Sequence, residues 1–180
     1  AFSAHLTGQE GAELRRWLLG AENKGQSRAR GLKQRLETLI MDRDELRDAV
    51  NAVIQAAQCL PEQEFFLAHV RAQVMARAAE GDRGYSIETD CKPAIDPVLA
   101  SAADLDRALA ALEKPAKALI KIIAHMLDEK ADELESAERQ RLDAAIRSLE
   151  RRAIMQVAAW RGMLESLVDA TPPEFVDWFA

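Results

Sequence analysis

The sequence has few of the residues that build sheets or small cross-linked folds. Of its 180 residues only 5% are aromatic, one is tyrosine and two are cysteine. Two cysteines are too few for a disulfide framework in a chain of this size. No stretch approaches the roughly 18 consecutive apolar residues of a membrane helix, and no signal peptide is visible. We therefore expect a cytoplasmic protein that does not engage a membrane.

Motifs that would bind or hydrolyse a nucleotide are also missing. The sequence contains no G-x-x-x-x-G-K-[ST] or G-x-G-x-x-G loop, no H-E-x-x-H, no paired C-x-x-C and no G-x-S-x-G elbow. Among the histidines and cysteines, no two share the (i, i+3) or (i, i+4) spacing of one helix face. These residues are His5, Cys59, His69, Cys91 and His125. We predict no catalytic residue, metal site or cofactor within these 180 residues.

What the sequence does contain is typical of one globular helical domain. Apolar residues make up 48% and charged residues 30%, a balance that differs from that of disordered chains. Alanine and leucine are abundant, which favours helix over sheet. The length is sufficient to bury a sizeable core, so we treat residues 1–180 as a single domain.

The charge is unevenly distributed along the chain. A formal net charge of −6 argues against a domain whose main task is to coat nucleic acid, because phosphate binding needs clustered Lys and Arg. One stretch nevertheless has five basic residues and no acid: Lys24, Arg28, Arg30, Lys33 and Arg35. The segment from Asp128 to Glu138 is its opposite, with six acids and one lysine.

The first half of the chain predicts a short helix followed by a long one. Thr7-Gly8-Gln9-Glu10 matches a capping box, and Gly20 suits the carboxyl-terminal cap of the helix that begins there. From about Ser27 a 4-3 heptad spacing continues to Leu60, with Arg43 as its one polar position. The unbroken phase favours one continuous helix of about 45–50 Å over a new helix capped at Asp42 or Glu45. The apolar heptad positions, here named the seam, are Leu32, Leu36, Leu39, Leu46, Val50, Val53, Ala57 and Leu60.

A further helix and an extended segment follow. Pro61 suits the first turn of a helix that reaches about Ala79. Tyr85–Asp90 alternates in character and is interpreted as an extended excursion rather than part of a sheet. Near the end of the chain, a double proline precedes a strand-like segment beginning near Phe175, which has no obvious partner strand. We interpret both ends of the sequence as cut edges of a longer protein.

Two more long helices complete the pattern. Asp96-Pro97 is a cap followed by a proline at the first helical position. The apolar phase then continues through Pro115 to Met126, which indicates a kink rather than a stop. After the acidic segment, Ser136 can cap the last helix. Its apolar positions are Leu142, Ile146, Leu149, Ala153, Val157, Trp160, Leu164 and Leu167.

These elements predict an all-α fold. Long amphipathic helices bury their apolar faces most simply against one another, which gives an elongated antiparallel bundle of three long helices plus one or two short helices. A short extended excursion lies near residues 85–90. We expect Trp17 and Trp160 to anchor the core.

The basic residues of the chain allow two interpretations. Those between Lys24 and Arg35 are candidates for contact with phosphate, and Lys24, Arg28 and Arg35 fall on one helical stripe; the alternative is solvated surface charge. The arginines of the last helix are expected to form exposed ion pairs with neighbouring acids. These are Arg139, Arg147, Arg151, Arg152 and Arg161.

Several stretches resemble one segment of bacterial DinG-type helicases, relatives of the XPD-like, iron–sulfur branch of superfamily two. They are the opening Ala1–Glu10, then Leu14–Leu18, Val70–Val74 and Tyr85–Asp90, and the closing Pro173–Trp178. None of these stretches is a catalytic signature, so the resemblance rests on their order and spacing.

The resemblance implies a parent enzyme that unwinds DNA using ATP and Mg, with an iron–sulfur cluster held, if at all, outside this segment. The chain would be a non-catalytic, arch-like helical insertion beside the path of single-stranded DNA, and its partners would be the motor domains and that strand. The family's ATP-binding loop, acidic box and cluster cysteines have no matching positions here, so no catalytic residue is transferred. The alternative function is a stand-alone helical interaction module that dimerises through the seam.

Overall fold

A computed structural model describes residues 8–20, 30–61, 63–77, 89–90, 93–168 and 178–179. Almost all of these residues are helical. The elements in chain order are α1 (Gly8–Leu19), α2 (Leu32–Arg35), α3 (Glu37–Ile40), α4 (Asp44–Gln58), α5 (Gln63–Arg77), β1 (Thr89–Asp90), α6 (Asp96–Glu129), η1 (Ala131–Glu133), α7 (Ser136–Leu149), η2 (Glu150–Gln156), α8 (Val157–Ser166) and β2 (Trp178–Phe179).

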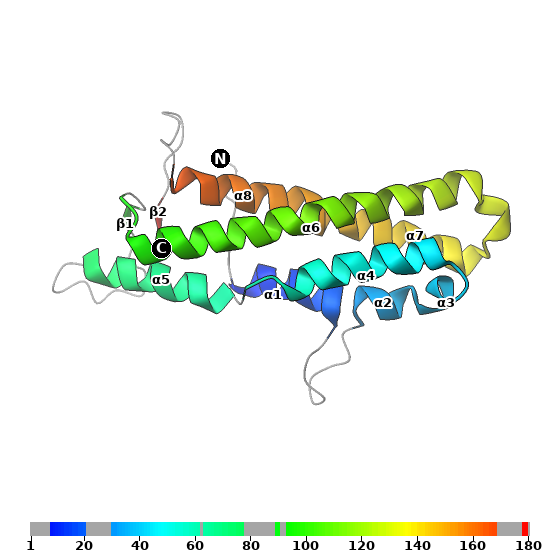
Figure 1. Cartoon of the computed structure of the whole chain (residues 1–180), viewed down its shortest axis with the longest axis horizontal. Coiled ribbons are helices and arrows are strands. Elements are labelled where there is room, and N and C mark those ends of the chain that lie inside the picture. Colours follow the sequence, from blue (N-terminus) through cyan, green and yellow to red (C-terminus); the bar gives the residue numbers. More distant parts are fainter. Residues whose placement is uncertain are drawn as a thin grey trace.

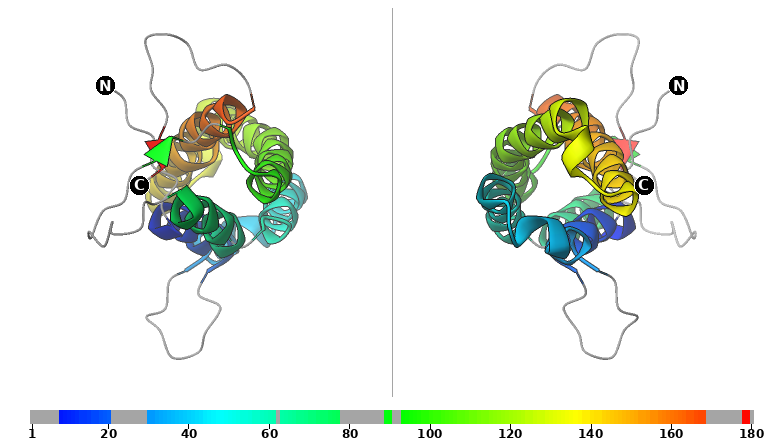
Figure 2. Two further views of the ribbon diagram at one scale, coloured as in Figure 1. Left: turned by 90° about the vertical axis from the view of Figure 1, so that its left-hand side faces the viewer. Right: turned by 90° about the vertical axis from the view of Figure 1, so that its right-hand side faces the viewer.

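The helices form an elongated antiparallel bundle of four rods, which confirms the predicted all-α class (Figure 1). Two rods are single long helices: α6, of 34 residues, and the uninterrupted α7–η2–α8, of 31 residues. The other two are composite, because α1, α2 and α3 follow one another in one direction and α4 and α5 return in the other. The end views show the four rods around a common axis (Figure 2).

The core lies along that axis, and α6 contributes more of its described residues than any other helix. Its buried positions keep an unbroken 4-3 spacing, which keeps them on one face of a helix whose neighbours lie nearly parallel to it. They are Val98, Ala102, Leu105, Leu109, Leu112, Ala116, Leu119, Ile123 and Met126. The helix continues through Pro115, so the prediction that this proline does not end it is confirmed. Trp160 is fully buried as expected, whereas Trp17 is only half-buried against the core.

The prediction of one continuous helix from Ser27 to Leu60 is wrong. The helix is interrupted at Leu36 and again at residues 41–43, where the chain reverses so that α2 and α3 pack against α4. All seam residues are nevertheless buried. A helical hairpin can bury the same apolar positions as a straight rod, so spacing alone does not distinguish them. Arg43, the one polar position of the heptad pattern, lies at this reversal. Its guanidinium donates to the Leu39 carbonyl at 3.3 Å and lies 3.7 Å from the Glu138 carboxylate.

The last helix contains a wide π-helical turn that the sequence analysis did not anticipate. Leu149, Ala153 and Val157 are all buried although they are spaced 4-4 rather than 4-3. In a regular α-helix eight residues advance about 80° beyond two full turns, which would rotate Val157 off the core face. The π segment η2 holds more residues per turn and so keeps all three on that face.

Helix ends agree with prediction in part. Gly20 has a φ of 88° and its N–H donates to the Arg16 carbonyl at 2.9 Å, which confirms it as the cap of α1. The predicted cap at Ser136 is wrong by one residue: Glu135 is the N-cap, and its N–H donates to the Glu138 carboxylate at 2.9 Å. Asp96 is likewise the first helical residue and not the cap. Thr7 lies outside the described residues.

Side-chain hydrogen bonds fasten α5 to the start of α6. The buried Gln73 accepts the Ile95 N–H at 3.0 Å, and His69 Nδ1 lies 3.1 Å from the Ser101 hydroxyl. The ladder of β1 and β2 lies at the same end of the bundle (Figure 1). It pairs Thr89 with Phe179 and Asp90 with Trp178 in antiparallel register, so the expectation of an unpartnered excursion is corrected.

None of the described helices combines the length and the apolar character needed to cross a lipid bilayer.

Candidate nucleic-acid interface

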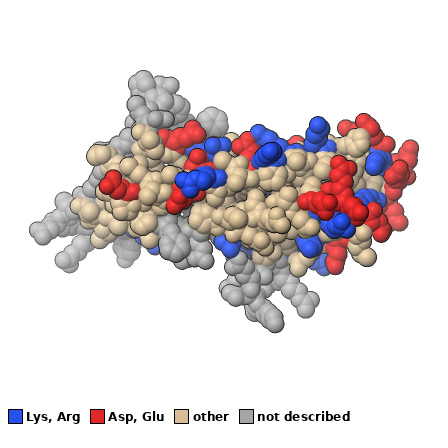
Figure 3. Space-filling model, in the orientation of Figure 1, with Lys and Arg blue, Asp and Glu red and all other residues tan. Residues whose placement is uncertain are grey.

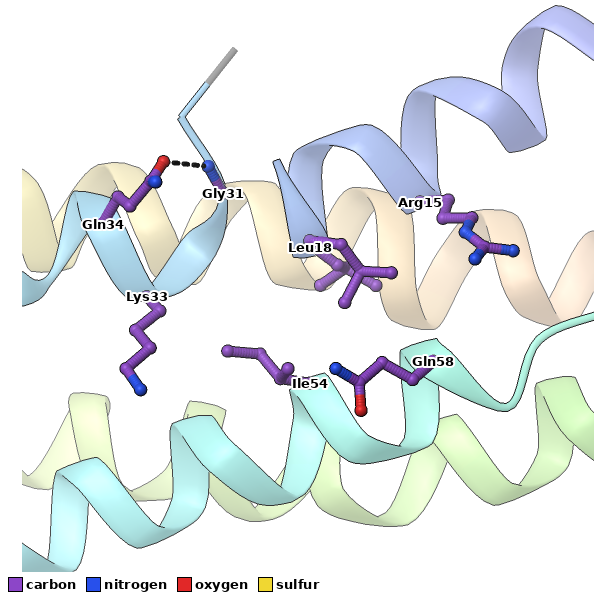
Figure 4. Close-up of a pocket in the computed structure, with 8 residues that line it drawn as sticks. Arg15, Leu18, Gly31, Lys33, Gln34, Ile54 and Gln58 are labelled. Carbon is purple, nitrogen blue, oxygen red and sulfur yellow. Dashed lines mark hydrogen bonds between the residues drawn. The ribbon is translucent and has the colours of Figure 1, made fainter. Parts of the chain in front are cut away.

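A cleft of about 480 Å³ opens where α1, α2 and α4 meet (Figure 4). Its basic residues are Arg15 of α1 and Lys33 of α2, and its polar walls are the amides Gln34 and Gln58. Among the residues that the structure describes, no acidic side chain lines it. The apolar part of the lining consists of Leu18, Leu19, Gly31 and Ile54.

Local sequence accounts for the shape of this cleft. The positive φ of Gly20 ends α1 sharply, and the extended Gly31 starts α2 against that end. The Gly31 N–H donates to the Gln34 side chain at 3.1 Å, which fixes the first turn of α2 (Figure 4). Lys33 therefore extends from α2 toward α4, opposite Ile54 and Gln58.

The two cations of the cleft, Arg15 and Lys33, differ in the contacts that they make. Arg15 is half-buried, and its Nη1 donates to the Leu60 carbonyl at 3.4 Å, so it brings a fixed positive charge to the wall. Lys33 is exposed and makes no ion pair with any described residue. Figure 4 shows Lys33 and Arg15 at opposite sides of the cleft, so each cation could contact a separate anionic oxygen of a phosphodiester chain.

The structure places only part of the predicted basic stretch. Lys24 and Arg28 lie outside the described residues. Arg30 and Arg35 are exposed and close to each other, because the Arg35 Nε donates to the Arg30 carbonyl at 2.9 Å. Of the three residues of this stretch that the structure describes, only Lys33 lines the cleft. The predicted helical stripe through Arg35 is not formed, because the backbone at Arg30 and Gly31 is not helical.

Sequence reasoning missed Arg15, Gln34 and Gln58. They come from three helices, and nothing in their local patterns indicates that the helices meet. The usable signal was the pair Gly20 and Gly31, since glycines permit the close backbone approach that forms the cleft.

Acidic side chains gather at one end of the bundle, where some basic side chains lie among them (Figure 3). The α6–α7 corner is acidic, with Asp128, Glu129, Asp132, Glu133 and Glu135 all exposed.

The arginines of the last rod make more varied contacts than the expected exposed pairs. Arg161 is half-buried and bridges two helices, with its Nε 2.8 Å from the Asp106 carboxylate and its Nη1 3.3 Å from that of Glu113. This proximity raises the pKa of Arg161. Arg147 pairs with Asp143 as predicted, whereas Arg152 lies 3.9 Å from Glu13 on α1.

The candidate metal ligands do not come together in the part of the chain that the structure describes. His69 contacts Ser101, His125 lies 3.5 Å from Glu129, and Cys59 is an exposed free thiol at the end of α4. Within these residues no group of three or more His, Cys, Asp or Glu side chains is placed to hold a metal ion. His5 and Cys91 lie outside the described residues.

A comparison of the chain with models of known protein families, with curated proteins and with solved structures finds no match. The resemblance to DinG-type helicases is therefore a hypothesis that rests on the stretches quoted above.

Proposed function

We propose that this chain is a non-catalytic helical accessory domain of an ATP-dependent DNA helicase, which guides single-stranded DNA beside the motor. The observation that carries the proposal is the cleft with Arg15 and Lys33, whose described lining contains no acidic side chain, in a chain whose net charge is −6. Two cations in one groove of a chain with excess acid present a local attraction for phosphate.

The chemistry of the cleft favours the backbone of a strand over its bases. Single-strand binding that reads or grips bases uses aromatic side chains as stacking platforms. The cleft has aliphatic and amide walls instead. Contact would then be largely independent of sequence, which is what a guide for a translocating strand requires.

The bundle architecture supports a passive role. Two rods of more than 30 residues, packed along one core, make a stiff wall rather than a moving element. The alternative, dimerisation through the seam, is disfavoured because the seam residues are buried within this chain.

The test is binding of a fluorescein-labelled dT30 strand, measured by anisotropy between 50 and 300 mM salt. We expect weak binding that falls steeply as salt rises. Lys33→Glu should weaken it, whereas Lys130→Glu, at the acidic corner, should change it little. The same preparation should show no ATP hydrolysis. Salt-independent binding, equal effects of the two variants, or ATPase activity of the purified chain would overturn the proposal.

A further inference from the structure

The outward face of α6 carries a row of basic side chains. Its buried positions keep a strict 4-3 spacing, so its most exposed positions repeat with the same spacing on the opposite side. Between Arg107 and His125 every exposed side chain of α6 is either basic or alanine. The basic ones are Arg107, Lys114, Lys117, Lys121 and His125, here named the α6 row.

The geometry of the α6 row is regular. Arg107, Lys114 and Lys121 are seven residues apart, which places successive cations about 10.5 Å apart along the helix. Ala111 and Ala118 occupy the exposed positions between them. These small side chains leave the helix surface open between the cations, so an extended chain could lie close to it.

Neighbouring acids pair with three members of the α6 row, one of them His125, which lies 3.5 Å from Glu129, but leave the other two unpaired. Asp106 and Glu113, which are half-buried on α6, both contact Arg161 of α8. Glu113 also pairs with Lys117, and Arg107 pairs with Asp104 at 3.0 Å. Lys114 and Lys121 make no ion pair with any residue that the structure describes, and both are exposed. Lys114 and Lys121, seven residues apart, therefore remain as two unpaired cations on a chain with excess negative charge.

We infer that the α6 row is a second contact surface for the phosphodiester backbone of single-stranded nucleic acid, separate from the cleft. Two unpaired lysines on one edge of a helix, Lys114 and Lys121, are suited to contact a polyanion with evenly spaced charges. The row follows one edge of a single helix and so matches one phosphodiester chain. The identity of the partner rests on the proposed function, whereas the location of the contact does not.

The salt dependence of binding tests this inference. Each phosphate contact contributes about −0.7 to the slope of log K against log salt for a single strand. The double variant Lys114→Gln/Lys121→Gln should therefore bind dT30 more weakly than the wild type, with a slope reduced in magnitude by about 1.4. A matched control, Lys130→Gln/Arg151→Gln, removes the same charge from exposed positions outside the row. It should retain the wild-type slope. Circular dichroism of both variants checks that the helices are intact.

The outcomes distinguish a failure of the α6 row alone from a failure of the proposed function. If the wild type binds dT30 and Lys33→Glu weakens it, but the row variant keeps the slope of its control, the α6 row is wrong and the proposed function stands. If the row variant loses slope only on a 30-base-pair duplex, the inferred single-stranded partner is wrong. If the wild type binds no dT30 at all, both proposals fail.

Discussion

The backbone of Gly31 lies directly against that of Gly20. A Cβ atom on Gly31 would be 2.7 Å from the Gly20 amide nitrogen and equally close to the carbonyl carbon of Leu19. Because both obstacles are backbone atoms, neither can rotate away, so the close approach of α2 to the end of α1 depends on the missing side chain.

Gly31→Ala should therefore destabilise the protein by about 1–3 kcal/mol, the usual cost of forcing an extra methyl group into a packed contact. Gly162→Ala is the matched control, because Gly162 lies in the exposed interior of α8 and a Cβ there meets nothing within 4 Å. That change should stabilise the helix by about 0.5–1 kcal/mol. Urea unfolding of the two variants measures both effects. Equal effects of the two substitutions would contradict the close approach.

Stability should fall in acid partly because of Glu113. Its pKa lies below the ordinary value of 4.5, first because Lys117 donates a hydrogen bond to the carboxylate and adds its charge, and further because of the Arg161 charge. A carboxyl whose pKa is lowered by folding stabilises the folded state above its unfolded pKa, and this contribution is lost as the pH falls through the folded pKa.

Glu113→Gln should therefore reduce the loss of unfolding free energy between pH 5 and pH 3. The measurement is the urea midpoint across that range. The control is Glu133→Gln, since Glu133 is exposed and forms no ion pair within the described residues. A Glu113→Gln profile parallel to that of the wild type would show that the contacts of Glu113 contribute nothing to folding.

Trp160 should be the most costly single side chain to truncate. It is 2% exposed and is the largest of the fully buried side chains. Trp160→Ala should cost about 3–5 kcal/mol, from lost burial and the cavity left behind. Met155→Ala, one turn earlier on the same rod, should change stability by less than about 0.5 kcal/mol, because Met155 is 69% exposed. Thermal unfolding followed by circular dichroism distinguishes the two.

The chain should sediment as a monomer. The seam residues that could join two chains are buried against the chain's own helices, Val53 and Leu36 fully so. Sedimentation equilibrium at several concentrations measures the mass directly. A dimer that dissociates with exposure of the seam would favour the stand-alone interaction module instead.

Periodicity predicted the class of fold and most of the core, because burial on a helix follows spacing. The unbroken phase of α6 and the buried Trp160 were both predictable in this way. The reversal before α4 was not, since the positions on either side of Arg43 keep the same spacing in a rod and in a hairpin. The 4-4 step at Ala153 was present in the sequence, but its consequence depends on tertiary burial overriding the regular helix.

The candidate site was predictable only in part, for a related reason. Local charge identified Lys33 as a residue that could meet phosphate. Arg15 and Gln58 reach the same cleft only because three helices meet there, and helix contact is not encoded in the spacing within any one of them. The sequence analysis did not identify the α6 row either, because its cations are three to seven residues apart and do not form a continuous basic run.

The free thiol at the end of α4 gives this bundle a built-in reporter position. Cys59 is exposed and directly follows Gln58, which lines the cleft. With Cys91 replaced by serine, a thiol-reactive dye would attach at this one place. Its emission could then follow the arrival of a strand at the groove without any label on the strand itself.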